Sequence, residues 1–479
     1  MEPKPEQAAA QSEELPHVLV FPAPYHGHAT PLFSLAAALA THGLHITILV
    51  LPCLPSLSAF MASASSRLLP ISFLSLPAPA PAPAPHSPDL HTIIHSLSLL
   101  SDPIRRLILD LPSPPTALIS DMFLGFTEPL ARSFSIPRFT FYPSGAYATS
   151  IFHSIWLNNP PEPTTEPTGP IEPTSSSSTI TISDVPSAPS FEFGQLSGLF
   201  VRYKRAERSI PLDPAWASVR DCWLWNIESH GRVLNTFADA EGEFLSHLGP
   251  VEQAGRVWAV GPLHMLAESG TEGEGLARAE EWLKGRAEGS VVYVCFGTMA
   301  SFNQDQVDAM ASGLKTSGAK FLWVMPNHWE LPPGFESSIQ DHGAVLRGWV
   351  PQARVLGHKA IGAFLTHCGW NSVLEGLAAG VPMVGWPLGA EQHLNARLLV
   401  EGLRVGVLVT EGKVGGLDPG SLARAVARVM EPRSTERVHA RLMGEAARQA
   451  VVPGGSSRVD LEGLVEELMR LHAKGITPK

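Results

Sequence analysis

The sequence predicts an α/β protein with two domains, each built on a parallel sheet. At 479 residues the chain is longer than one hydrophobic core usually organises. Hydrophobic residues make up 44% of it and charged residues 16%, as in globular proteins. Short apolar runs alternate with helix-like segments near the start and again after residue 268. Such alternation favours parallel strands with helices on both faces.

The first alternation begins at His17. His17 to Phe21 (HVLVF) has the apolar composition of a buried strand. Thr30 and Pro31 suit the N-cap and first position of a helix, and Gly43 suits its end. His45 to Leu51 (HITILVL) is the next expected strand.

Two tracts interrupt this pattern. Leu76 to Pro88 alternates Ala and Pro, and Asn158 to Ser190 is rich in Pro, Ser and Thr, so both are expected to form extended loops within the first domain. We place the interdomain linker at 257–268. The predicted domains are therefore 1–256 and 269–450, and 451–479 forms a final helix.

The second alternation contains the expected strands Ser290 to Phe296 and Lys320 to Val324. The last helix follows the sequence GGSS at 454–457. Its apolar face is formed by Leu461, Leu464, Val465 and Leu468.

Charge, the N-terminus and the cysteines exclude several classes. The net charge is -11 and no Lys/Arg cluster is present, which argues against a nucleic-acid partner. The polar N-terminus and the lack of a long apolar run predict a cytoplasmic protein without membrane insertion. Without CxxC spacing, reduced thiols are expected at Cys53, Cys222, Cys295 and Cys368.

The segment from Ala360 carries the clearest chemical pattern. Ala360 to Leu365 is an expected strand, His367 to Trp370 a tight turn, and Asn371 the start of a helix. The N-terminus of a helix that follows a turn can bind a pyrophosphate, and His367, Asn371 and Ser372 add donors there. Glu375, one turn after Asn371, could accept hydrogen bonds from ribose hydroxyls. These residues alone fit an ordinary capped helix equally well.

The full stretch from Trp349 to Gln392 resembles the signature box of plant secondary-product UDP-glycosyltransferases. Other segments also have counterparts in that family, namely FPAPYHGH, ISDMFLGF, GRVLNTF, VWAVGPL, VVYVCFGTM and GGSS. The resemblance implies the GT-B fold, in which two Rossmann-like domains face each other across a cleft. It also implies that the last helix crosses back to the first domain.

The resemblance also implies a donor site. Trp349 would stack on the uracil, with Val350 beside it, and Gln352 and Glu375 would hold the ribose. The diphosphate would lie among Thr298, His367, Asn371 and Ser372. The sugar would face Trp370, Glu391 and Gln392.

A histidine after the first strand is the candidate base. His28 ends Tyr25-His26-Gly27-His28, where α/β sheets place groups that face ligands, although a simple loop histidine is the alternative. A phenol with a pKa of about 10 needs a base when it attacks. The resemblance implies that His28 is this base and that Asp121 orients it. The family often has Gln where this chain has His26.

Acceptor contacts are expected from Phe123, Ser144 and Tyr147. No metal site is expected, because the sequence around His26 and His28 offers no further Cys/His ligands. We interpret Asp239-Ala240-Glu241 as a solvated turn. A GxGxxG motif is missing after the first strand, which argues against a dehydrogenase.

Together these features predict an inverting, metal-independent O-glycosyltransferase that acts as a monomer without a cofactor. It would move glucose from UDP-glucose to a phenolic hydroxyl of a flavonoid or similar metabolite. In the resembled family Gln at the position of Gln392 goes with glucose, whereas Glu391 replaces the commoner Asp. The alternatives are transfer from UDP-rhamnose or another UDP-sugar, and a non-catalytic nucleotide-sugar binder.

Overall fold

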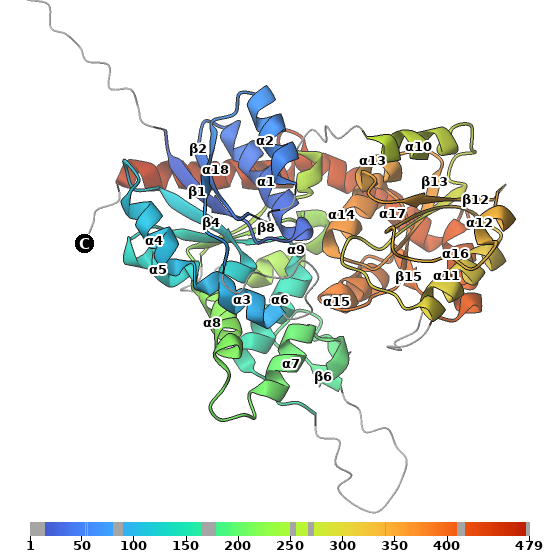
Figure 1. The fold of residues 1–479 in the computed structure, drawn as a ribbon, viewed down its shortest axis with the longest axis horizontal. Helices are drawn as coiled ribbons and strands as arrows, with labels where there is room; N and C mark the ends of the chain where they lie inside the picture. The colour runs from blue at the N-terminus through green and yellow to red at the C-terminus, as the bar shows by residue number, and fades with distance from the viewer. Residues whose placement is uncertain are drawn as a thin grey trace, which may run out of the picture.

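A computed structural model describes residues 15–52, 54, 56–79, 90–163, 179–249, 255–266, 273–340, 342–409 and 417–475. Two parallel sheets form the frame, and helices cover both (Figure 1). The strand order is β3-β2-β1-β4-β5-β8-β9 in the first sheet and β12-β11-β10-β13-β14-β15 in the second. The predicted fold class is confirmed.

The first half of the chain supplies the seven-stranded sheet. Its strands are β1 (His17–Phe21), β2 (His45–Val50), β3 (Ile71–Ser75), β4 (Ala117–Asp121), β5 (Arg138–Tyr142), β8 (Gly231–Leu234) and β9 (Val257–Ala259). Its helices are α1 (His26–Ala40), α2 (Leu57–Ser66), α3 (Leu90–Ser98), α4 (Ser101–Leu109), the short η1 (Met122–Leu124), α5 (Thr127–Ser133), α6 (Ala146–Asn158), α7 (Gly198–Ala206), α8 (Pro214–Glu228) and α9 (Ala238–Leu248).

The second half supplies the six-stranded sheet. Its strands are β10 (Val291–Cys295), β11 (Lys320–Met325), β12 (Gly343–Arg347), β13 (Ile361–Thr366), β14 (Met383–Gly385) and β15 (Gly406–Leu408). Its helices are α10 (Glu274–Leu283), α11 (Gln304–Ser317), α12 (Phe335–Ser338), α13 (Gln352–Leu356), α14 (Trp370–Ala379), α15 (Gln392–Arg397), α16 (Pro419–Met430), α17 (Thr435–Val451) and α18 (Ser456–Lys474).

The strand order of each parallel sheet changes direction at one point. In the first sheet β1 lies between β2 and β4, and in the second sheet β10 lies between β11 and β13. Loops that leave neighbouring strands in opposite directions open a crevice at the carboxyl ends of those strands. Ligand sites are therefore expected after β1 and β4 and after β10 and β13.

The expected strands are confirmed within one or two residues, but the start of the first helix was predicted wrongly. Helix α1 begins at His26, with Tyr25 as its N-cap, so Pro31 lies inside the helix. A proline cannot donate to the carbonyl four residues earlier. The helix extends past it because the carbonyl of Gly27 obtains a donor from elsewhere in the chain, as shown below. This places His28 in a helical turn and not in a loop.

The two low-complexity tracts lie partly outside the described residues, which omit 80–89 and 164–178. The described end of the second tract was expected to be loop. It contains β6 (Thr179–Thr181), which pairs antiparallel with β7 (Ser190–Glu192), because Ile180 and Phe191 bury their side chains.

Helix α18, drawn in red in Figure 1, lies beside the first sheet. Its residues Leu461, Leu464 and Leu468 belong to a buried cluster with β1 and β2, and the Asp460 side chain accepts a hydrogen bond from the Ala259 N–H at 2.8 Å. Ala259 ends β9, so the segment expected as the linker begins as a strand of the first sheet. The division into domains itself stays a prediction.

Candidate active site

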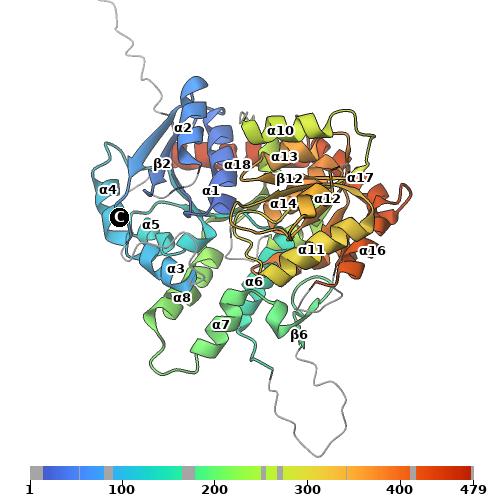
Figure 2. The same ribbon diagram turned by 45° about the vertical axis from the view of Figure 1, so that its right-hand side comes forward.

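The expected site residues come from the four strand ends that flank the two reversal points. His28 follows β1 and Asp121 ends β4, whereas Thr298 follows β10 and His367 follows β13. Hydrogen bonds join the two halves where α14 meets α1, and the two helices face each other in Figures 1 and 2. The sequence places these residues far apart, and the topology brings them to one region.

His28 and Asp121 form a close pair. The Nδ1 atom of His28 lies 2.8 Å from Oδ2 of Asp121, whose side chain is fully buried. The other oxygen, Oδ1, accepts a hydrogen bond from the Phe123 N–H at 2.9 Å. A proton held on Nδ1 leaves Nε2 of the neutral ring as the acceptor of a further proton.

Two opposing effects set the basicity of His28. Burial by itself lowers its pKa, but the charge and hydrogen bond of Asp121, with a further contribution from Glu391, outweigh it and raise the pKa above 6.5. His26 differs, because its Nδ1 lies 3.1 Å from the Ser56 hydroxyl and burial lowers its pKa. The geometry therefore favours His28 over His26 as a base.

Of the three expected acceptor residues, the structure brings only Phe123 into ring contact with His28. The rings of Phe123 and His28 stack with their centroids 4.5 Å apart. Ser144 is buried with its hydroxyl 3.2 Å from that of Thr149, and Tyr147 is buried against Phe244. An acceptor could reach the last two only if their surroundings rearranged.

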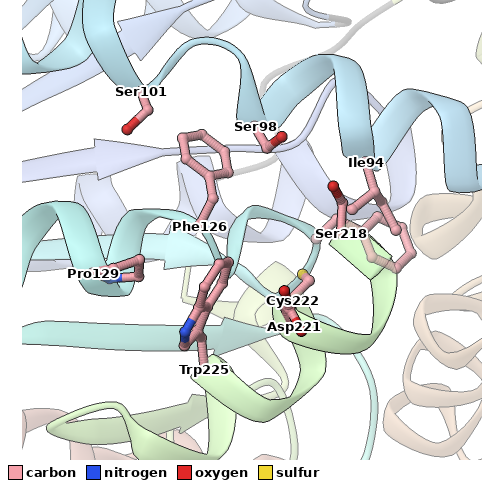
Figure 3. Close-up of a pocket in the computed structure, with 10 residues that line it drawn as sticks. Ile94, Ser98, Ser101, Phe126, Pro129, Ser218, Asp221, Cys222 and Trp225 are labelled. Carbon is pink, nitrogen blue, oxygen red and sulfur yellow. The ribbon is translucent and has the colours of Figure 1, made fainter. Parts of the chain in front are cut away.

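A cavity of about 240 Å³ lies beside Phe123, between α3, α4, α5 and α8 (Figure 3). It is lined by Ile94, Ser98, Ser101, Phe123, Phe126, Pro129, Ser218, Asp221, Cys222 and Trp225. Phe123 is the one of these residues that was named above as an acceptor contact. The lining includes neither His28 nor Asp121, so the two predicted catalytic residues lie outside this cavity.

The N-terminus of α14 lies beside His367. Burial lowers the pKa of His367 to about 4, so the ring is neutral and carries one N–H. Gly297, at φ +70°, lies against this ring, because a Cβ there would stand 3.1 Å from Cε1 of His367. The loop that carries Thr298 is thereby held next to the helix N-terminus, which is suited to bind an anion.

Three residues predicted to bind the donor substrate are joined by hydrogen bonds. Nε2 of Gln352 donates to the Ser372 hydroxyl at 2.9 Å and to the Glu375 carboxylate at 2.7 Å. Burial raises the pKa of Glu375 to about 7, although the hydrogen bond from Gln352 opposes this shift. This carboxylate therefore changes charge near neutral pH.

The indole of Trp349 is available for stacking. It is 55% exposed, which is unusual for a tryptophan. The neighbouring Val350 side chain is buried in the core, so only its backbone could meet a ligand.

The three residues expected at the sugar adjoin one another. The backbone N–H of Trp370 donates to Glu391 at 3.4 Å, and its indole N–H donates to the carbonyl of Asn235 at 2.7 Å. Oε1 of Gln392 accepts from the N–H groups of Leu388 and Gly389 at 2.8 and 3.1 Å. That oxygen is occupied within its own loop, so a sugar would meet the amide nitrogen.

Two residues near the site were missed or misinterpreted. Asn235 follows β8 in the segment GRVLNTF, and its position directly after a strand was the available signal. Glu241 was expected in a solvated turn, which was wrong. It is fully buried and accepts hydrogen bonds from the N–H groups of Ala146 and Tyr147, both at 2.8 Å, because it caps the buried N-terminus of α6.

Within the described ranges, no three His, Cys, Asp or Glu side chains lie close enough together to hold a metal ion. The cysteines described, Cys222, Cys295 and Cys368, are free thiols; Cys53 falls outside the described residues. None of the described helices has both the length and the apolar composition of a membrane span.

Comparison with known proteins identifies the family. Residues 271–437 match the family described as UDP-glucoronosyl and UDP-glucosyl transferase. The chain is 37% identical to flavonol 3-O-glucosyltransferase UGT89B1 of Arabidopsis thaliana, over 95% of this chain and 96% of the relative.

Solved structures extend the agreement. UGT71G1 of Medicago truncatula, in complex with UDP-glucose, has a TM-score of 0.79 at 27% identity, covering 95% of this chain and 98% of the other. UGT89C1 of A. thaliana, at 29% identity and 95% coverage of this chain, was solved with quercetin (TM-score 0.72, 100% of that chain) and with UDP-L-rhamnose (TM-score 0.71, 99%). The chain therefore belongs to the plant family 1 UDP-glycosyltransferases and is an enzyme that transfers a sugar from a UDP-sugar.

Proposed function

We propose that this enzyme transfers glucose from UDP-glucose to a phenolic hydroxyl of a flavonoid or related phenol, with inversion at the anomeric carbon. The observation that carries the proposal is the His28–Asp121 pair. The pKa of its histidine is raised by Asp121 and also by the charge of Glu391, one of the residues expected to face the sugar. This supports a base near Glu391.

The reaction would be a single displacement. Nε2 of His28 takes the proton of the acceptor hydroxyl while Asp121 stabilises the imidazolium that forms. The acceptor oxygen bonds to the anomeric carbon, and the bond from that carbon to the diphosphate breaks, with its electron pair leaving on UDP. An α-linked donor then gives a β-glycoside.

Three groups of this chain would stabilise the negative charge on the departing UDP. The N-terminus of α14 offers backbone N–H groups, His367 offers its single ring N–H, and Thr298 offers a hydroxyl. Preorganised donors of this kind stabilise a leaving anion without reorganisation. Trp349 would stack on the uracil, while Gln352 and Glu375 would hold the ribose.

The acceptor class rests on relatives. UGT89B1 is named for transfer to a flavonol, and UGT89C1 was solved with quercetin. Phe123, which stacks on His28, would offer a flat face to an aromatic acceptor held within reach of the base.

The donor sugar has a second candidate, since UGT89C1 was solved with UDP-L-rhamnose. The test is competition among UDP-glucose, UDP-galactose, UDP-xylose, UDP-rhamnose and UDP-glucuronate at equal concentration with quercetin, with products identified by mass and linkage. UDP-glucose is expected to dominate and to give a β-glucoside. A preference for any other donor would overturn the donor assignment, and an α-linked glucoside formed from UDP-glucose would overturn the single displacement.

A further inference from the structure

The carboxamide side chains of Asn235 and Asn371 link the two halves of the molecule close to the proposed base, His28. Asn235 follows β8 in the first half, and Asn371 lies in the first turn of α14 in the second. Nδ2 of Asn235 donates to Oδ1 of Asn371 at 3.4 Å, and Nδ2 of Asn371 donates to the carbonyl of Gly27 at 2.8 Å. Gly27 immediately precedes His28.

The orientation of the first amide is fixed by its surroundings. Asn235 is 3% exposed, and its Oδ1 accepts a hydrogen bond from the Leu263 N–H at 3.0 Å. Gly261 packs so closely on the same oxygen that a Cβ there would approach to 2.5 Å. With its oxygen held by Leu263, Asn235 presents its N–H groups to Asn371.

The orientation of the second amide follows from the first. Oδ1 of Asn371 faces a donor, so its nitrogen must be the atom that faces Gly27. A carboxamide nitrogen carries two hydrogens, and the Gly27 contact uses one of them. The other remains for the diphosphate or sugar of the donor substrate.

The carbonyl of Gly27 is open to this bond for a reason visible in the sequence. In a regular helix it would accept the N–H of residue 31, four positions later. Residue 31 is Pro31, which has no N–H, so the helix itself leaves this carbonyl without its usual donor.

We propose that Asn235 is a positioning residue of the transfer reaction, which orients the amide of Asn371 and thereby fixes the donor residues of α14 relative to the helical turn that carries His28. This rests on the proposed roles of Asn371 and His28. Trp370 supports the same arrangement, because its indole N–H donates to the backbone carbonyl of Asn235, a bond that no side-chain substitution at 235 removes.

The decisive variant is Asn235→Asp, assayed at a pH where the carboxyl is ionised, because it then keeps the shape and the acceptor for Leu263 but cannot donate to Asn371. We expect kcat to fall about tenfold or more, the cost of one buried hydrogen bond in a positioned network. The KM for acceptor and the Kd for UDP should change less than about threefold. Asn235→Ala should likewise lower kcat and leave the KM for the acceptor nearly unchanged. It serves as the second variant if a buried carboxylate impairs folding, which circular dichroism would detect.

The matched control is Asn303→Asp. Asn303 caps α11 with its side-chain oxygen, which an aspartate supplies equally well, so wild-type kcat is expected. A double-mutant cycle with Asn371→Ala then separates positioning from general stability. If Asn235 acts through Asn371, the double variant Asn235→Ala/Asn371→Ala should have nearly the kcat of Asn371→Ala alone.

Two results would overturn the proposal. One is a folded Asn235→Asp enzyme with wild-type kcat, and the other is a double variant in which the two single effects multiply. The cycle is assayed with whichever UDP-sugar the wild-type enzyme prefers. Failure of UDP-glucose as donor would therefore refute the proposed donor without affecting this test.

Discussion

At the scale of single residues, the proposed base depends on one buried carboxylate. Burial by itself would lower the pKa of His28, and the ion pair with Asp121 reverses the direction of that shift. His26, two residues earlier, lacks such a partner among the described contacts and bonds to Ser56 instead. The neighbouring groups therefore shift the pKa values of the two histidines in opposite directions.

We predict that His28→Ala reduces kcat by about 10² to 10⁴, the usual contribution of a general base. Its Kd for UDP should stay near that of the wild type, because the base serves the acceptor. His26→Ala is the control and should keep most activity. If instead His26→Ala is inactive and His28→Ala turns over normally, the base has been misassigned.

The pH profile should report the same pair. His28 works as a neutral base, so kcat/KM is lost as the pH falls through its raised pKa, above 6.5. In Asp121→Asn the raising charge is gone, and the acidic limb should move to lower pH while kcat also drops. Initial rates from pH 5 to 9 would show this, and an unshifted limb would contradict the coupling.

Glu375 should make donor binding depend on pH. Its pKa of about 7 means that the carboxylate which would accept ribose hydrogen bonds becomes protonated below neutrality. We expect UDP-glucose binding to weaken by up to about tenfold between pH 8 and pH 5.5, the value of about one hydrogen bond to a charged group. Calorimetric titration should show this in the wild type and a nearly flat dependence in Glu375→Gln.

At the scale of elements, the N-terminus of α6 joins the two halves through close packing. Glu241 from α9 caps it with two hydrogen bonds, and Trp370 of α14 packs against Gly145, its N-cap. A Cβ on Gly145 would lie 2.6 Å from a Glu241 oxygen and 2.7 Å from the Trp370 ring. Its φ of -73° is open to any residue, so glycine is required here because a side chain would clash and not because of the backbone conformation.

Gly145→Ala should therefore displace Trp370 or break the Glu241 cap. We expect the free energy of unfolding to fall by about 1–3 kcal/mol and the transfer rate to fall with it. The control is Gly242→Ala in α9, where a Cβ meets nothing within 4 Å, so stability should hold or rise slightly. Equal stability of both variants in urea unfolding would disprove this account.

At the scale of the whole molecule, the site is assembled from two sheets. Each half contributes residues at its own reversal point, and bonds such as Asn371 to Gly27 hold the halves together. A buried hydrophobic cluster that includes Tyr142 and Ala146 of the first half and Trp370 and Val373 of the second continues across the junction. The proposed base and the residues proposed to bind the donor are therefore attached to one continuous core.

The positive end of α14 leads to a prediction for the complete enzyme. In the proposed site the helix N-terminus and neutral His367 would face the diphosphate, so the protein itself would stabilise the charge of the leaving group. Activity in excess EDTA should equal activity without it. A large loss that magnesium or manganese restores would refute this mechanism.

The sequence by itself determined the fold class, most strands and the likeness to a family, because apolar periodicity and motif spacing are local properties. It also singled out the Trp349 to Gln392 stretch and His28 and Asp121, which the structure brings together as a pair. It misjudged features that depend on distant partners. In helix α1, which contains Pro31, the side chain of Asn371 donates a hydrogen bond to the carbonyl of Gly27. Glu241 is buried where its carboxylate accepts hydrogen bonds from the first N–H groups of α6.

Only the tertiary structure decided which residues meet. Asn235 and Asn371 are separated by more than a hundred positions, yet they form one chain of amides. The buried places of Ser144 and Tyr147 likewise follow from the packing of α6. A hydrogen bond or a burial cost depends on the groups within a few ångströms, and for these residues the sheet topology selects those groups.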